Sequence, residues 1–142
     1  MKGDIALKIQ ESAENYLETI LVLQKRNDHV RSIDIVNELN FTKPSVSVAM
    51  KNLRQNGLIE VDANGYITLL EAGLTIANKI YERHTILTEW LVQMGVSPEV
   101  ADEDACKIEH VISTESFLAI KKEYLSKKRG DKGRSNLPSH LL

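Results

Sequence analysis

The chain of 142 residues has one cysteine, three prolines and few aromatic side chains, which make up 5% of it. A single cysteine cannot form a disulfide within the chain, so we expect a reducing compartment and a thiol that is available for metal or redox chemistry. No apolar run approaches the ~20 residues of a membrane-spanning helix. The first residues, MKGDIALKIQESAENY, lack the apolar core of a secretory signal. We therefore expect a cytoplasmic protein with no part in the membrane.

Common catalytic patterns are also missing. The sequence has no nucleophile beside a base, no glycine-rich phosphate loop and no His-Glu-x-x-His zinc motif. These absences argue against an enzyme, including a metal hydrolase built on His84, Glu109 and His110.

Charge is distributed unevenly along the chain. The net charge of −2 by itself argues against binding to nucleic acid. Residues 25–57, however, contain six bases and three acids (+3), whereas residues 58–116 contain eleven acids and three bases (−8). Residues 121–134 return to seven bases and two acids (+5). This order is compatible with a basic surface for an anion and an acidic region for a cation.

The first half of the chain predicts three helices. Apolar residues recur at helical spacing over residues 14–26. A second helix over residues 32–39 has Ser32 as its expected N-cap and a stripe of Ile33, Val36 and Leu39. The third begins at Thr42 as the N-cap, has Pro44 in its first turn, and is closed by Gly57. The short connections between these helices are typical of a helix-turn-helix.

The outward face of the third helix is suited to DNA. Val46, Ala49, Met50 and Leu53 face inward. Small hydroxyl side chains on the first turns suit insertion into a major groove, and basic side chains further along suit phosphates. The candidate DNA-binding residues are Thr42, Lys43, Pro44, Ser45, Ser47, Val48, Lys51, Asn52 and Arg54.

The segment LIEVDANGYITLL predicts a β-hairpin after the third helix. Asn64-Gly65 favours a type I′ turn, in which both central residues have positive φ. Three helices and a hairpin make a winged helix-turn-helix. The plainer alternative is that these helices pack against one another for stability alone and do not bind DNA.

The second half predicts helices again. A long amphipathic helix ends at Gly95, and its apolar surface fits either a dimer interface or the core of its own domain. Ser97-Pro98 opens the next helix, and Thr114 is expected to cap the last one. We expect a mainly α-helical chain with a winged domain at 1–72, a helical metal-binding and dimerisation domain at 73–127, and a flexible basic tail at 128–142.

Potential metal ligands occur in the segment DACKIEHVIS. Cys106, Glu109 and His110 stand at i, i+3 and i+4, so on a helix they share one face. Thiolate, carboxylate and imidazole all bind divalent transition metals. Further candidates are His84 in the long helix and Asn15 and Glu18, which stand at i and i+3 in the first helix. For each residue alone, a core or surface role is the plainer interpretation.

Several segments in order resemble the metal-dependent repressors of the diphtheria toxin repressor and manganese transport regulator family. They are SAENYLETILVL, KPSVSVAMKNLRQNGLI, GYITLLEAG, YERHTIL and DACKIEHVIS, and the resemblance runs through about residues 11–120. It implies a homodimer that binds palindromic double-stranded operator DNA when a divalent transition metal is bound. A metal-loaded form that represses metal-homeostasis genes is the implied function.

The resemblance also implies which residues bind the metal. His84, Glu109 and His110 match family ligands, Glu18 matches the manganese branch, and Cys106 matches the iron-type repressors. Asn15 replaces an Asp or Met, and Thr88 replaces a Glu. These departures leave the second metal position open, and Glu89 and Asp102 are the candidates to compensate for them.

The expected metal is Fe²⁺ or Mn²⁺, with Co²⁺, Ni²⁺ or Zn²⁺ as possible substitutes in vitro, and the thiol favours Fe²⁺. The alternative function is a winged-helix regulator that senses a non-metal effector or the oxidation of Cys106.

Overall fold

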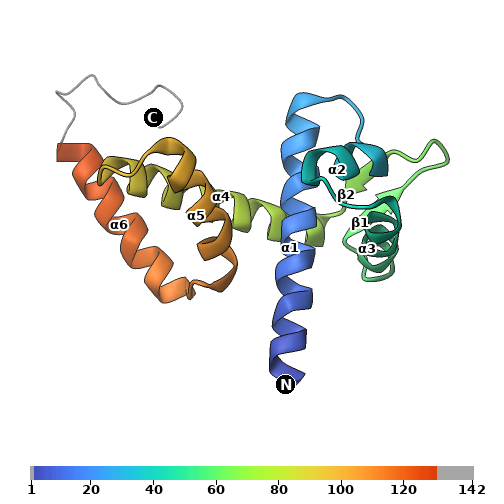
Figure 1. Cartoon of the computed structure of the whole chain (residues 1–142), viewed down its shortest axis with the longest axis horizontal. Helices are drawn as coiled ribbons and strands as arrows, with labels where there is room; N and C mark the ends of the chain where they lie inside the picture. Colours follow the sequence, from blue (N-terminus) through green and yellow to red (C-terminus); the bar gives the residue numbers. More distant parts are fainter. Residues whose placement is uncertain (1, 131–142) are drawn as a thin grey trace. The chain divides into compact units, whose positions relative to one another are not determined.

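The computed structural model describes the backbone of residues 2–130 and the side chains of residues 10–129. The described elements follow the order α1 (Lys2–Arg26), α2 (Ser32–Leu39), α3 (Lys43–Gln55), β1 (Ile59–Val61), β2 (Ile67–Leu69), α4 (Glu71–Gln93), α5 (Pro98–Val111) and α6 (Thr114–Gly130) (Figure 1). The predicted mainly helical fold class, with its two-stranded wing, is confirmed. No helix among the described residues is long and apolar enough to cross a membrane.

The chain divides into two compact units, residues 1–81 and 82–142. Helix α4 contributes to both units, since the division falls between Tyr81 and Glu82. The boundary that we predicted, between residues 72 and 73, lies instead near the start of this helix.

The first unit is a winged helix around one apolar core. Leu17 and Ile20 of α1, Ile35 of α2, Val46 of α3 and Ile59 of β1 are all fully buried in it. Burial of aliphatic side chains at this level is the main force that holds the three helices and the wing together.

Helices α1 and α2 differ in detail from the prediction. Helix α1 begins at Lys2 rather than at residue 14, because the residues before Glu14 are mostly good helix formers and contain no proline. Helix α2 has Arg31 rather than Ser32 as its N-cap, since the Asp34 carboxylate accepts a hydrogen bond from the Arg31 N–H at 2.8 Å. Its buried residue is Ile35, whereas Ile33 is 43% exposed. The prediction was therefore wrong for Ile33, whereas Val36 and Leu39 of the predicted stripe are partly buried against the core.

Helix α3 confirms the prediction at both ends. Thr42 is the N-cap, and its hydroxyl oxygen accepts a hydrogen bond from the Ser45 N–H at 3.3 Å. Gly57 follows the helix with a φ of 71°, a conformation that is strained for residues with a side chain. Val46, Met50 and Leu53 are buried, as predicted. The opposite face of the helix is therefore free to meet a partner.

The wing is a hairpin, but its turn is not the predicted one. Strand β1 pairs antiparallel with β2, with Glu60 opposite Thr68. Five residues connect the strands, and only Gly65 among them has a positive φ, of 81°. The Asp62 carboxylate accepts hydrogen bonds from the N–H groups of Asn64 and Tyr66 at 2.8 and 2.9 Å. This side chain stabilises a longer loop in place of the expected type I′ turn.

The second unit packs α5 and α6 against the rest of α4. Leu87, Ala105 and Phe117 form its core cluster, with one residue from each helix. Ser97 caps α5 as predicted. Helix α6 is instead capped by Ser113, whose hydroxyl oxygen accepts from the Ser116 N–H at 3.1 Å. Thr114, the predicted cap, accepts a hydrogen bond from Arg83 and is the first residue of the helix.

The proposed flexible tail lies mostly outside the described residues. Residues 128–130, which we assigned to it, continue helix α6. The remainder, 131–142, is not among the described residues.

Candidate metal centre and DNA-binding surface

Three predicted metal ligands come together in the second unit. Helix α4 supplies His84, and α5 supplies Cys106 and Glu109 at the i and i+3 positions of one face. His84 Nδ1 lies 2.8 Å from Glu109 Oε2 and 3.7 Å from Cys106 Sγ. One ligand atom from each of the three residues lies within 4.8 Å of those from the other two. The cluster therefore offers nitrogen, sulfur and oxygen ligands to a single point.

The electrostatics of the cluster favour a positive charge at its centre. Hydrogen bonds to Cys106 first, and then to Glu109, raise the pKa of His84 to about 11, although burial acts in the opposite direction. At neutral pH the imidazole is therefore protonated. Its neighbours stabilise a cation between helices α4 and α5, which is also what a metal site requires.

Glu109 is the most buried member of the cluster, with 1% of its side chain exposed. Its Oε1 atom is buried and has no hydrogen bond in the described part of the chain, while the other oxygen contacts His84. His110 Nε2 lies 3.5 Å from that Oε1. A buried carboxylate oxygen is costly unless it has a partner. The position of His110 beside Glu109 fits its predicted role, although the three-residue cluster does not include it.

Arg83 holds the end of helix α5 against α4. Its buried guanidinium donates to the backbone carbonyls of Glu109 at 3.2 Å and Ile112 at 2.8 Å, and to the Thr114 hydroxyl at 3.2 Å. The last carbonyls of a helix lack partners within the helix, so these bonds stabilise its C-terminus. Because Arg83 is adjacent to His84, it links the position of Glu109 to that of the histidine. The sequence contains no signal for this role of Arg83, because a lone arginine belongs to no recognised motif.

The residues considered for a second metal position differ in their surroundings. Asp102 Oδ1 lies 2.8 Å from His84 Nε2, so this exposed carboxylate orients the histidine ring. The Thr88 hydroxyl donates to the His84 backbone carbonyl at 2.7 Å. Glu89 is buried and accepts a hydrogen bond from the Tyr124 hydroxyl. Asp102 therefore adjoins the histidine of the cluster, whereas Glu89 is occupied within the core. A role of either residue at a second metal position stays a prediction.

Asn15 and Glu18 belong to helix α1 of the winged unit. Their backbones are one turn apart on that helix, and Glu18 is 8% exposed. Their contribution to metal binding stays a prediction.

The donor set of the second unit fits a divalent transition metal. Histidine, thiolate and carboxylate are present together, and one oxygen of the buried carboxylate lacks a hydrogen bond within the described chain. The thiol suits Fe²⁺, Co²⁺ or Zn²⁺ better than Mn²⁺, which prefers oxygen ligands.

The candidate DNA-binding residues lie on the exposed face of α3 and at its N-cap. All nine predicted residues are exposed, and the apolar Val48 is 60% exposed. Within the set, the Thr42 hydroxyl donates to the Ser45 hydroxyl at 2.8 Å. Val48 follows Ser47, so an exposed β-branched side chain stands next to a hydroxyl, which suits the apolar and hydroxyl contacts of a base edge. The roles of these residues stay a prediction.

Both halves of the chain match family models. Residues 8–66 match the iron-dependent repressor N-terminal DNA-binding domain, and residues 70–132 match the iron-dependent repressor metal-binding and dimerisation domain. Together these two models account for most of the chain.

Relatives agree with these matches. The chain is 33% identical to the transcriptional regulator MntR of Escherichia coli over 112 residues, which cover 79% of this chain and 72% of MntR. It is 27% identical to the iron-dependent repressor IdeR of Mycobacterium tuberculosis over 107 residues, or 75% of this chain and 46% of IdeR.

Solved structures share the fold. A manganese-dependent transcriptional repressor in complex with manganese superposes with a TM-score of 0.73 at 24% identity, covering 79% of this chain and 52% of the other. The IdeR of T. acidophilum superposes with a TM-score of 0.64 at 28% identity, covering 82% and 53%. The chain thus spans about half the length of these structures. By its domain models and relatives, the chain belongs to the iron-dependent repressor family, the family of the diphtheria toxin repressor and the manganese transport regulator.

Proposed function

We propose that this protein is a metal-dependent transcriptional repressor that binds operator DNA when a divalent transition metal is bound. The observation that carries the proposal is the approach of His84, Cys106 and Glu109 within one unit, in a chain whose other unit is a winged helix. A bound cation would supply positive charge to this cluster, and His84 would release its proton.

The same family supports the cellular setting of the protein. We propose a cytoplasmic regulator rather than an enzyme, which acts on genes of metal homeostasis as a homodimer on palindromic DNA. The second unit exposes apolar side chains that suit a dimer interface, among them Met94, Val111 and Leu118, each more than half exposed.

The first experiment measures DNA binding against metal. A duplex selected from a random library by the Co²⁺-loaded protein is labelled, and fluorescence anisotropy is recorded with Mn²⁺, Co²⁺, anaerobic Fe²⁺ or a chelator. We expect metal to tighten DNA binding by about tenfold or more, the usual scale of coupling between two sites. Equal affinity with metal and with chelator would contradict the proposal.

The second experiment tests the ligands directly. We expect Co²⁺ to slow the alkylation of Cys106 by iodoacetamide in the wild type. His84→Gln should lose this protection, whereas Glu103→Gln, which changes an exposed carboxylate on the same helix as Cys106, should keep it. His110→Ala should lose the response of DNA binding to metal while its circular dichroism stays that of a folded protein.

Oxidation of Cys106 is the second candidate signal, since the thiol is exposed and lies next to a protonated histidine. In that case peroxide would change DNA binding, and a chelator would not. The metal-dependent function predicts that the chelator changes it in fully reduced protein.

A further inference from the structure

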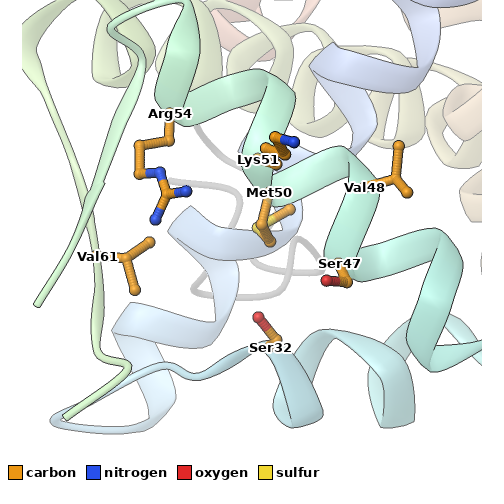
Figure 2. A pocket seen from close by; sticks show the side chains of 7 residues that line it. All are labelled: Ser32, Ser47, Val48, Met50, Lys51, Arg54 and Val61. Atoms are coloured by element: carbon orange, nitrogen blue, oxygen red, sulfur yellow. The ribbon is translucent and has the colours of Figure 1, made fainter. Parts of the chain in front are cut away.

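A hollow of about 300 Å³ lies in the winged unit, and four of the candidate DNA-binding residues help to line it. Its walls come from three elements: the first residue of α2, the outer face of α3, and strand β1. Four of the lining residues are polar or basic, namely Ser32, Ser47, Lys51 and Arg54. Figure 2 shows the hydroxyls of Ser32 and Ser47 pointing into the hollow, and the Arg54 guanidinium beside Val61.

The side chains that line the hollow favour the binding of an anion. No acidic residue is among the residues that line the hollow. Within the described chain neither Lys51 nor Arg54 forms an ion pair, and the side chains of Ser32 and Ser47 make no hydrogen bonds. Two cations and two hydroxyl donors therefore face one space with none of their charge neutralised. Met50 and Val61 add an apolar wall, beside which charged interactions are less weakened by water.

The position of the hollow selects the backbone of DNA as the source of that anion. In a helix-turn-helix, the N-terminal part of the recognition helix contacts base edges, and the preceding helix crosses the sugar–phosphate backbone. Lys51 and Arg54 lie in the second half of α3, and Ser32 lies at the start of α2. The partial positive charge at the start of α2 acts in the same direction.

We propose that this hollow binds a single backbone phosphate of the operator in each half-site, held jointly by Arg54, Lys51, Ser32 and Ser47. The proposal rests on the DNA-binding function proposed above, and it adds Ser32 to the DNA-binding residues. Because the two cations share one phosphate, the geometry fixes the register of α3 on the duplex rather than the identity of a base.

The test pairs single-residue variants with single-phosphate changes in the DNA. Each phosphate of the selected duplex is replaced in turn by a neutral methylphosphonate, and the affinity of the metal-loaded protein is measured. We expect one position in each half-site to weaken wild-type binding by about tenfold. Each of three variants should bind natural DNA more weakly than the wild type, namely Arg54→Gln, Lys51→Gln and Ser32→Ala. For each of them, a neutral phosphate at that same position should cause no further loss of affinity. Lys79→Gln, an exposed lysine of α4, should match the wild type.

The salt dependence of binding gives an independent measurement. The slope of log K against log salt falls by about 0.9 for each phosphate contact that is lost. We expect the salt slope of the double variant, Lys51→Gln with Arg54→Gln, to fall by about the value of one phosphate contact per half-site. If the two cations contacted two different phosphates, the slope would fall by the value of two contacts.

The outcomes separate this inference from the function on which it rests. If the three variants lose their response to methylphosphonate at different positions of the duplex, the shared site is overturned, while the proposed DNA binding stands. Equal sensitivity of variants and wild type at every phosphate would also overturn it, as expected if the hollow held a free phosphorylated molecule. A wild type that binds no DNA with any metal would defeat the proposed function itself. Ser32, Lys51 and Arg54 are all exposed, so each variant is expected to fold, and each one tests the site by itself.

Discussion

At Gly73 the main chain of helix α4 lies so close to Leu58 that no side chain fits. A Cβ atom added at this glycine would lie 2.1 Å from the backbone oxygen of Leu58, which also accepts a hydrogen bond from the Leu70 N–H at 3.0 Å. The obstacle is backbone and cannot rotate away. We expect Gly73→Ala to lower the free energy of unfolding by about 1–3 kcal/mol, as measured by urea denaturation. Asn78→Ala, exposed on the same helix, is the control and should be close to neutral.

The single sulfur atom of the metal cluster should decide its metal preference. Cys106 supplies the one soft ligand beside His84 and Glu109. We expect Cys106→Ser to weaken Co²⁺ binding by more than about tenfold, with a smaller effect on Mn²⁺, because Mn²⁺ gains little from a thiolate. The near-ultraviolet thiolate-to-cobalt absorption should disappear in the variant. An unchanged Co²⁺ spectrum would mean that Cys106 does not contact the metal.

At the scale of secondary-structure elements, Arg83 is expected to set the packing of α5 on α4. Arg83→Met keeps the apolar part of the side chain but leaves the carbonyls of Glu109 and Ile112 without their donor. We expect a loss of about 2–3 kcal/mol in unfolding free energy. Among molecules that remain folded, Co²⁺ affinity should fall and the cobalt spectrum should broaden. Tyr124→Phe, which removes a hydrogen bond elsewhere in the same unit, controls for a general loss of stability.

Helices α4 and α6 are joined by a buried polar pair, in which the Tyr124 hydroxyl donates to Glu89. Burial first, and then this hydrogen bond, raises the pKa of the Tyr124 phenol above its ordinary value of about 10. The stability that the protonated phenol contributes is fully present below pH ~10, and it declines above that pH as the unfolded chain loses the proton.

Tyr124→Phe should therefore be less stable than the wild type at pH 8, because Glu89 loses its donor. The difference in unfolding free energy should shrink as the pH rises above ~10, since the wild type alone loses the phenol contribution. Urea denaturation of both proteins from pH 8 to pH 11 measures this difference. A constant gap across that range would contradict the assigned pKa shift.

At the scale of the whole molecule, metal and DNA should promote each other's binding. If metal tightens DNA binding by a given factor, DNA must tighten metal binding by the same factor. We expect the dissociation constant for Co²⁺, titrated with and without the selected duplex, to fall by the factor that anisotropy gives for DNA. A mismatch between the two factors would show that another equilibrium, such as dimerisation, takes part.

The sequence by itself determined the succession of elements and the types of chemistry available. Periodic apolar residues, Thr42 and Gly57 at the ends of α3, and Ser97 before α5 predicted elements that the structure contains. These signals are local, because capping and periodicity act within one or two turns. The i, i+3 spacing of Cys106 and Glu109 likewise placed both on one face of a helix before any packing was known.

Only the tertiary structure decided which groups meet across the sequence. The approach of His84 to Glu109 and Asp102, the hydrogen bonds of Arg83 to the end of α5, and the hollow between α2, α3 and β1 join residues from separate elements. The turn of the wing also depended on the Asp62 side chain rather than on the Asn-Gly pair. Such contacts depend on how helices pack and rotate against one another, and the periodicity of one helix contains no information on the position of the next.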